Sequence, residues 1–420
     1  MIAAIENSGA NSKRGIVATA LFPAFRTRFA IALLLTFFPY GLLYPLDYPI
    51  GELLTLCSWI WVFPSPVGRL ALGIVPLIAT EAYGYFAFNL FCLIANLSIA
   101  WSASRCADFD GFRISGLHRF ARGCMVATLV IAAVQAITGP SIWVELFPRM
   151  LLTPGRGAGL KYEPSQLASL LSLYLVLLAV RVKNLDALHE PLTMRKSLLW
   201  EAIWAILATV AVARSISVLI AAACFGPVLF IRRKHAVLTV AAMLAAVLVA
   251  VSVLGDRIQA AIGDADGSMT DLITSSLGSW RNIPDIAIVS NYSAFLVPGN
   301  PAEIRVKINT SVALMSPVFA WLENTYSIFA AGGVTAGLLV TVIAFIGGMA
   351  LGMKGLSSSS PTRISWLMMY LASWFILSKY DPSGWVVLGL LLLAPKLRRP
   401  EPEWSAPQVG EGLVPGIVET

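Results

Sequence analysis

The sequence predicts an all-α polytopic membrane protein with about twelve transmembrane helices and both termini in the cytoplasm. Three observations lead to this prediction: the composition, a series of long apolar stretches, and the placement of the basic residues. Of the 420 residues, 57% are hydrophobic and 13% are charged, with a mean hydropathy of +0.77. Soluble domains have about 45–50% apolar and about 25% charged residues. The composition therefore excludes a soluble enzyme, a disordered protein and a disulfide scaffold.

Several apolar stretches are long enough to cross a bilayer, which needs about 20 apolar residues of helix, or fewer where the ends of the span snorkel. They lie approximately at 29–45, 49–63, 69–84, 85–102, 121–138, 164–181, 197–213, 215–231, 236–254, 327–353, 363–379 and 383–396. The stretch at 327–353 is long and rich in glycine. It is compatible with a tilted span or with one that begins as a segment in the membrane interface.

The basic residues orient these stretches. With the N-terminus inside, 21 of the 30 Lys and Arg residues fall in cytoplasmic segments and nine fall outside. Short cytoplasmic loops carry such an excess in membrane proteins. Residues 1–28 are then a cytoplasmic N-terminal segment, 29–396 form the membrane domain, and 397–420 are a disordered cytoplasmic tail.

Two outer loops, 139–163 and 255–326, are much longer than the other outer turns. Loops as long as the second are uncommon without a function of their own. Within it, residues 271–289 mix Leu, Ile and Trp280 with Arg281 and two acids. This pattern is typical of a helix that lies along the membrane surface.

The end of the first outer loop, residues 154–163, combines glycines with charged side chains. Glycine lets backbone approach a ligand closely, while Arg156 and Lys161 supply positive charge. Glu163 stands at the start of the next helix, where the macrodipole favours an acid. The alternative interpretation is a flexible loop followed by a capped helix. A nucleotide-binding fingerprint is excluded, because no strand precedes the glycines.

Three ionisable residues stand where the chain is otherwise apolar or amphipathic. Arg214 lies in a very short outer turn, where it either faces a wet interior cavity or snorkels to the interface. Arg281 either serves a site or is an ordinary charge on a surface helix. Glu201 lies near the inner side of a span, as a proton-relay group or as a paired interior acid.

No metal site and no cofactor are expected from the sequence. His118, His189 and His235 all fall in predicted cytoplasmic loops beside basic residues, so they are interpreted as solvated and are given no role. The Asp264–Asp266 pair in the second outer loop is interpreted as a turn, since both residues lie beside glycine.

Three short motifs occur at the ends of predicted spans. Glu163-Pro164-Ser165 opens the sixth span, Arg214-Ser215 forms the next outer turn, and Leu322-Glu323-Asn324-Thr325-Tyr326 leads into the tenth span. Together with twelve spans, inside termini and enlarged loops after the fifth and ninth spans, these motifs resemble those of the Wzy-type O-antigen and exopolysaccharide polymerases.

This resemblance implies a lipid-embedded glycosyltransferase fold of the C type in the bacterial inner membrane. It also implies that polyprenyl-diphosphate-linked oligosaccharide repeats are joined on the periplasmic face. Arginine matches the oxygens of a diphosphate leaving group best. The candidate diphosphate-binding residues are Arg156, Arg214 and Arg281, with Lys161 and Arg149 behind them. Glu163 is the first candidate base and Glu323 the second.

The partners implied are the lipid-linked saccharide and the bilayer, with a chain-length regulator and export machinery as potential partners and no nucleic acid. The related O-antigen ligases use a histidine in the large outer loop, and this chain has none there, which favours a polymerase. A twelve-helix secondary transporter or flippase remains the alternative class, although the central inner connection at 182–196 is short for that group. A non-catalytic partner of an export system is a third alternative.

Overall fold

The computed structural model describes residues 25–38, 48–62, 99–101, 103–104, 114–146, 152, 154–161, 164–187, 192–226, 283–297, 301–315, 327–354, 360–375, 377 and 381–393. These residues are largely helical, and no β-strand occurs among them. The predicted all-α class is therefore confirmed for the described part of the chain.

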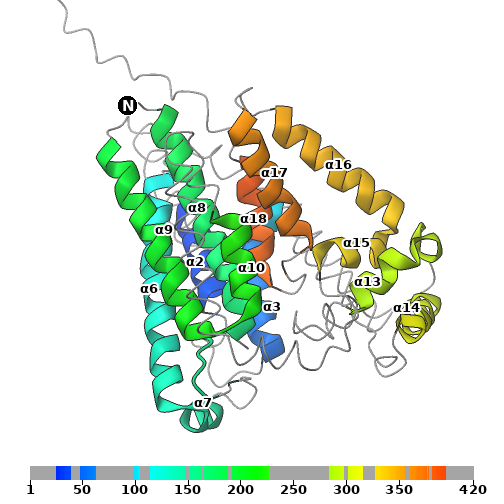
Figure 1. The fold of residues 1–420 in the computed structure, drawn as a ribbon, viewed down its shortest axis with the longest axis horizontal. Helices are drawn as coiled ribbons and strands as arrows, with labels where there is room; N and C mark the ends of the chain where they lie inside the picture. The colour runs from blue at the N-terminus through cyan, green and yellow to red at the C-terminus, as the bar shows by residue number, and fades with distance from the viewer. Residues whose placement is uncertain are drawn as a thin grey trace, which may run out of the picture.

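A bundle of antiparallel helices forms the main body of the described structure (Figure 1). Its helices are α2 (Phe25–Phe37), α3 (Tyr48–Val62), α6 (Ile114–Thr138), α8 (Leu167–Ala187), α9 (Leu192–Ala213), α10 (Ile216–Phe225), α17 (Ser360–Phe375) and α18 (Pro382–Leu393). Helix α8 lies at the centre and contacts α6, α9, α10 and α18. Every residue from Leu167 to Val180 is buried. A helix that is apolar all round is stable only inside such a core or a membrane.

Three of these helices are long and apolar enough to cross a membrane: Ile114–Thr138, Pro164–Val182 and Lys196–Ala213. They match the predicted fifth, sixth and seventh spans. Helix α6 also exposes Val126, Val130, Val134 and Ile137 along one face, although it is otherwise packed into the bundle. Such a stripe is expected on a helix whose outer face contacts lipid. The chain is an α-helical membrane protein.

Three predicted spans lie largely or wholly outside the described residues: 69–84, 85–102 and 236–254. The predicted span at 327–353 is corrected by the structure, because it consists of two helices, α15 (Ile328–Ala336) and α16 (Leu338–Lys354). Gly337 separates them with φ 86° and ψ 144°, a conformation available in practice to glycine only. A Cβ at Gly332 would lie 2.9 Å from Cγ2 of Thr341, so the glycine also lets the two helices pack closely.

A second, smaller apolar cluster lies beside the bundle. It is formed by α13 (Ile283–Ser290), the 3-10 helix η6 (Tyr292–Phe295), α14 (Pro301–Met315) and the α15–α16 break. Figure 1 shows α13 and α14 next to α15, to one side of the bundle. The predicted surface helix at 271–289 is described only from Ile283, and there it packs on α14 and α15. Helix α14 was not predicted.

The two ends of the bundle differ in the segments that they carry. Helix α7 (Pro140–Leu146) follows Gly139, whose φ of 81° turns the chain away from α6. Figure 1 shows α7 at the lower end of the bundle. We call this the α7 end; it also carries loop 154–161 and the two-residue turn 214–215 between α9 and α10.

Candidate functional site

The glycine-rich loop 154–161 is held against α6 and α9 at the α7 end. The side-chain amide of Gln135 accepts a hydrogen bond from the N–H of Ala158 at 2.8 Å and donates one to the carbonyl of Gly159 at 2.7 Å. The N–H of Gly157 donates to the carbonyl of Val212 at 2.9 Å. Gln135 is fully buried, so both loop groups are satisfied inside the protein. The loop is therefore a fitted part of the bundle rather than a free connection.

Two glycines of the loop serve this packing. A Cβ at Gly157 would clash with the carbonyl oxygen of Ala132, and one at Gly159 would lie 2.7 Å from Cγ2 of Thr128. Gly159 also has φ 64°, in the left-handed region. The close backbone approach predicted from the sequence is thus an approach to helix α6 at these two positions.

Arg156 and Arg214, two predicted diphosphate-binding residues, meet at the α7 end. Arg156 Nε donates to the carbonyl of Ala213 at 2.9 Å, directly before Arg214 in the chain. A Cβ at Gly155 would lie 3.1 Å from Nη1 of Arg214, so this guanidinium lies against the loop beside Arg156. The side chain of Arg214 is exposed. The structure therefore brings two arginines together from segments that are distant in the chain.

The backbone of Arg214 is left-handed, with φ 44°. It is the only non-glycine residue with positive φ in the described part of the chain. An L-residue adopts this conformation at a cost of roughly 1–2 kcal/mol. The N–H of Arg214 donates to the carbonyl of Val210 at 3.0 Å, which ends α9, and α10 begins at Ile216. Strain of this kind at a tight turn is a reason to look for a function of the side chain.

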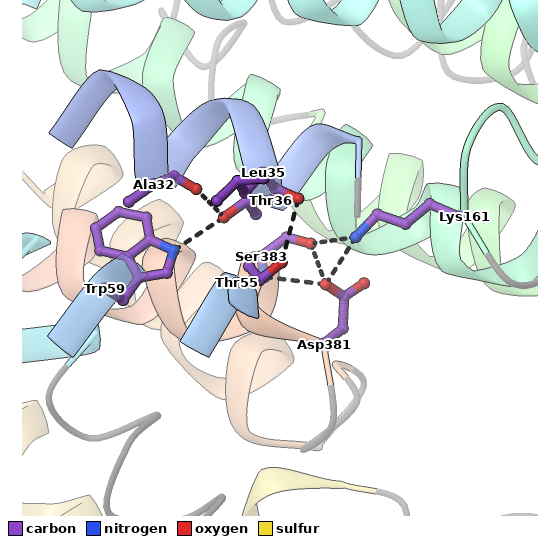
Figure 2. A network of polar contacts seen from close by, with 8 residues as sticks. All are labelled: Ala32, Leu35, Thr36, Thr55, Trp59, Lys161, Asp381 and Ser383. Carbon is purple, nitrogen blue, oxygen red and sulfur yellow. Dashed lines mark hydrogen bonds and ion pairs between the residues drawn. The ribbon is translucent and has the colours of Figure 1, made fainter. Parts of the chain in front are cut away.

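Lys161 forms a buried ion pair, and Figure 2 shows the network that it joins. Its Nζ lies 3.1 Å from Oδ1 of Asp381, and it donates a longer bond of 3.4 Å to Oγ of Ser383. The lysine and aspartate side chains are only 3% and 2% exposed. The N–H of Ser383 also donates to Oδ1 of Asp381 at 3.0 Å, and its hydroxyl makes a further bond to the same oxygen.

Asp381 was not identified from the sequence, although a signal was present. It stands before Pro382, the first residue of α18, and its carboxylate accepts from the N–H of Ser383 as an N-cap does. Asp381-Pro382-Ser383 is a second acid-Pro-Ser motif, like Glu163-Pro164-Ser165 before α8. Helices α8 and α18 pack against each other. A search for repeats of the first motif finds the second.

Four predicted site residues lie outside the described residues: Glu163, Glu323, Arg149 and Arg281. For the described positions, the structure places Arg156 and Arg214 together and Lys161 with Asp381. Among these positions no group of three or more His, Cys, Asp or Glu side chains is placed to hold a metal ion.

A second polar cluster lies at the opposite end of the bundle and corrects the prediction for His118. This histidine is on α6 and 2% exposed, whereas a solvated loop residue was expected; His189 and His235 lie outside the described residues. His118 Nε2 lies 2.8 Å from Oε1 of Glu201, and Nδ1 lies 2.8 Å from Nη1 of Arg181. The histidine can be buried because polar partners on two other helices satisfy its ring nitrogens: Arg181 on α8 and Glu201 on α9.

The contacts of His118 define its tautomer. A guanidinium has no lone pair to offer, so Arg181 donates and Nδ1 of His118 accepts. The proton of the neutral ring is then on Nε2, which donates to the carboxylate of Glu201. The hydroxyl of Tyr174 on α8 also donates to Glu201, and Arg122 Nε lies 3.8 Å away. Glu201 is thus a paired interior acid that ties three spanning helices together.

No family model, curated protein or solved structure matches this chain. The site must therefore be interpreted from its own chemistry. Paired guanidinium groups at one point of the surface bind phosphate oxygens well, because each presents a planar fork of N–H donors. A ligand at the α7 end that suits them carries phosphate or diphosphate.

Proposed function

We propose that the chain is a polymerase that joins polyprenyl-diphosphate-linked oligosaccharide repeats at the periplasmic face of the bacterial inner membrane. The observation that supports this most is the meeting of Arg156 and Arg214 beside Gly155 at the α7 end. Two cations on a tight loop and turn, at the end of a bundle of apolar helices, suit a diphosphate whose polyprenyl tail remains in lipid.

The reaction is a glycosyl transfer. A hydroxyl of one repeat attacks the anomeric carbon of another, and the bond from that carbon to the diphosphate oxygen breaks, leaving its electron pair on the diphosphate. Fixed N–H donors of Arg156 and Arg214 would stabilise this developing charge. A carboxylate must take the hydroxyl proton, and Glu163 and Glu323 remain the candidates from the sequence. Arg281 and Arg149 remain candidates for further diphosphate contacts, whereas Lys161 is engaged with Asp381.

The proposal includes the topology. With about twelve spans and both termini inside, the α7 end faces the periplasm, where lipid-linked repeats are assembled into polymer. The opposite end, with His118 and the basic residues Arg119 and Arg122, then faces the cytoplasm. This assignment agrees with the excess of Lys and Arg in the cytoplasmic segments.

Arg214→Gly is the sharpest test, because glycine adopts φ 44° without strain and the variant loses only the side chain. Polymer formation should fall by about 10²-fold or more, since a charge-stabilising donor is lost. Arg214→Lys should recover little of the loss, because an ammonium lacks the planar fork. Arg119→Ala, which removes an exposed cation at the opposite end, is the control and should make normal polymer.

The readout is the polymer ladder on a gel, normalised to protein in the membrane, together with the amount of single repeat on the outer face. Loss of polymer with intact delivery of single repeats supports the polymerase. Loss of both indicates a flippase. A normal ladder from Arg214→Gly would exclude this arginine from diphosphate binding.

A further inference from the structure

Only one of the two carboxylate oxygens of Asp381 accepts hydrogen bonds from the residues that the structure describes. Its Oδ1 receives Lys161, the N–H of Ser383 and the hydroxyl of Ser383. Its Oδ2 is buried and receives no hydrogen bond from any residue that the structure describes. Figure 2 shows this second oxygen directed away from the network that holds the first. An ionised carboxylate has about four lone-pair sites, and a buried acceptor without a donor costs about 1–3 kcal/mol or more.

The hydroxyl groups drawn near this carboxylate donate elsewhere. Thr36 donates to the carbonyl of Ala32 at 2.8 Å, and Thr55 donates to the carbonyl of Leu35. Ser383 bonds to Oδ1 of Asp381. These hydroxyls therefore give Oδ2 no donor, and the printed partners of the carboxylate, Lys161 and Ser383, both bind Oδ1 (Figure 2).

The charge balance at Asp381 limits what Oδ2 can bind. Lys161, 3.1 Å from Oδ1, already neutralises the buried carboxylate. A metal ion or a second ammonium would leave an uncompensated positive charge there, which is costly in a buried position. A neutral O–H donor has no such cost. A hydroxyl group is therefore the donor that best suits Oδ2 of Asp381.

We infer that Asp381 binds the attacking hydroxyl of the acceptor saccharide through Oδ2 and takes its proton during transfer. This inference rests on the proposed function and puts Asp381 in place of Glu163 and Glu323 as the base. The hydroxyl oxygen forms the bond to the anomeric carbon, and its proton passes to Oδ2. The diphosphate leaves with the electron pair of the broken bond. The protonated Asp381 later gives its proton to water, which restores the ion pair with Lys161.

The position of Asp381 supports this role. Lys161, which holds the carboxylate, belongs to the same loop as Arg156 and is five positions along the chain from it. Loop 154–161 thus carries both Arg156, which is proposed to bind the leaving diphosphate, and Lys161, which pairs with Asp381, the proposed base. The loop is fitted to α6 through Gln135, so both groups are held by a rigid element.

The test must separate proton transfer from the structural role of a buried ion pair. Asp381→Asn alone leaves the Lys161 ammonium buried and unpaired, which destabilises the fold. The double variant Lys161→Gln/Asp381→Asn removes both charges and keeps the approximate size of each side chain. The swap Lys161→Asp/Asp381→Lys keeps an ion pair but moves the carboxylate from α18 to the loop. Ser383→Ala removes one hydroxyl donor to Oδ1 and leaves Oδ2 unchanged.

The full-length protein in lipid nanodiscs is given polyprenyl-diphosphate-linked repeats, and turnover, KM, binding of labelled repeat and Tm are measured. We expect the double variant Lys161→Gln/Asp381→Asn, which we call the neutral pair, and the swap to bind repeat with wild-type affinity. Both should lose about 10²–10⁴-fold in turnover. Ser383→Ala should retain turnover within a few-fold. Where Tm shows that the neutral pair does not fold, the swap decides.

Two outcomes overturn the inference. Wild-type turnover by the neutral pair would show that no proton is taken at this position, and recovery of turnover by the swap would show that only the ion pair matters. In both cases wild-type polymer formation still supports the proposed function. Absence of polymer from the wild-type protein with added repeats would instead contradict the proposed function, and this inference with it.

Discussion

Arg214 shows at the scale of one residue how a strained backbone and an exposed charge coincide. Its φ of 44° costs roughly 1–2 kcal/mol relative to a helical or extended residue, and glycine would remove most of this cost. Arg214→Gly should therefore unfold at a Tm equal to or above that of the wild type while it loses polymer formation. A side chain that lowers stability and is needed for turnover is typical of a functional site.

Gly157 is the position of loop 154–161 where a side chain has no room. A Cβ there would clash with the backbone carbonyl of Ala132, and the backbone of a packed helix does not move easily. We expect Gly157→Ala to lower the free energy of unfolding by about 1–3 kcal/mol and to displace Arg156, with loss of polymer.

Gly123→Ala is the matched control, because nothing lies within 4 Å of the added Cβ in the middle of α6. Helix propensity there should raise stability by about 0.5–1 kcal/mol. Thermal unfolding of both purified variants in detergent checks the pair. Equal stability of Gly157→Ala and the wild type would contradict the packing of this loop on α6.

Three spanning helices are joined at the scale of elements by the cluster around Glu201. The carboxylate receives His118 from α6 and Tyr174 from α8, while Glu201 itself belongs to α9. Polar groups in a spanning bundle hold neighbouring helices in register, since none of them finds a partner in lipid. The cluster therefore sets how α6, α8 and α9 pack at the end opposite α7.

Glu201→Ala should destabilise the protein by about 3–5 kcal/mol, because the buried side chains of His118 and Tyr174 lose their acceptor. Glu145→Ala, on exposed α7, is the control and should leave Tm within error of the wild type. Since the cluster lies far along α9 from Arg214, folded Glu201→Ala protein at low temperature should retain its KM. A large change in KM with unchanged Tm would show that this cluster contacts the substrate.

The whole molecule is oriented by where its charges lie relative to the membrane. We expect Ser141→Cys on α7 and Thr310→Cys on α14 to react with a membrane-impermeant thiol reagent from outside the cell. Ser197→Cys near the start of α9 should react only after the membrane is permeabilised. These three side chains are exposed, and the five natural cysteines are replaced first to give a silent background.

Reaction of Ser197→Cys from outside, without reaction of Ser141→Cys, would invert the topology. Arg156 and Arg214 would then face the cytoplasm, and the proposed reaction with periplasmic repeats would be excluded. A uniform reaction of all three positions in sealed cells would indicate leakage, which a cytosolic marker protein detects in the same sample.

The sequence by itself determined the class of the protein and the positions of the long helices. Apolar length and the bias of basic residues are properties of neighbouring positions, so they need no knowledge of packing. The helices Ile114–Thr138, Pro164–Val182 and Lys196–Ala213 follow from them directly. The break at Gly337 was not predicted, because whether a glycine-rich stretch bends depends on what packs against it.

Only the tertiary structure decided which charged residues meet. Arg156 was expected to share a site with Arg214 on charge alone, and the turn at 214–215 brings them together. The pairing of Lys161 with Asp381 joins positions 220 residues apart, and the buried His118 has an acceptor on α9 and a donor on α8. Contacts of this range have no local signature, because the free energy that forms them comes from burying apolar faces of helices that are distant in the chain.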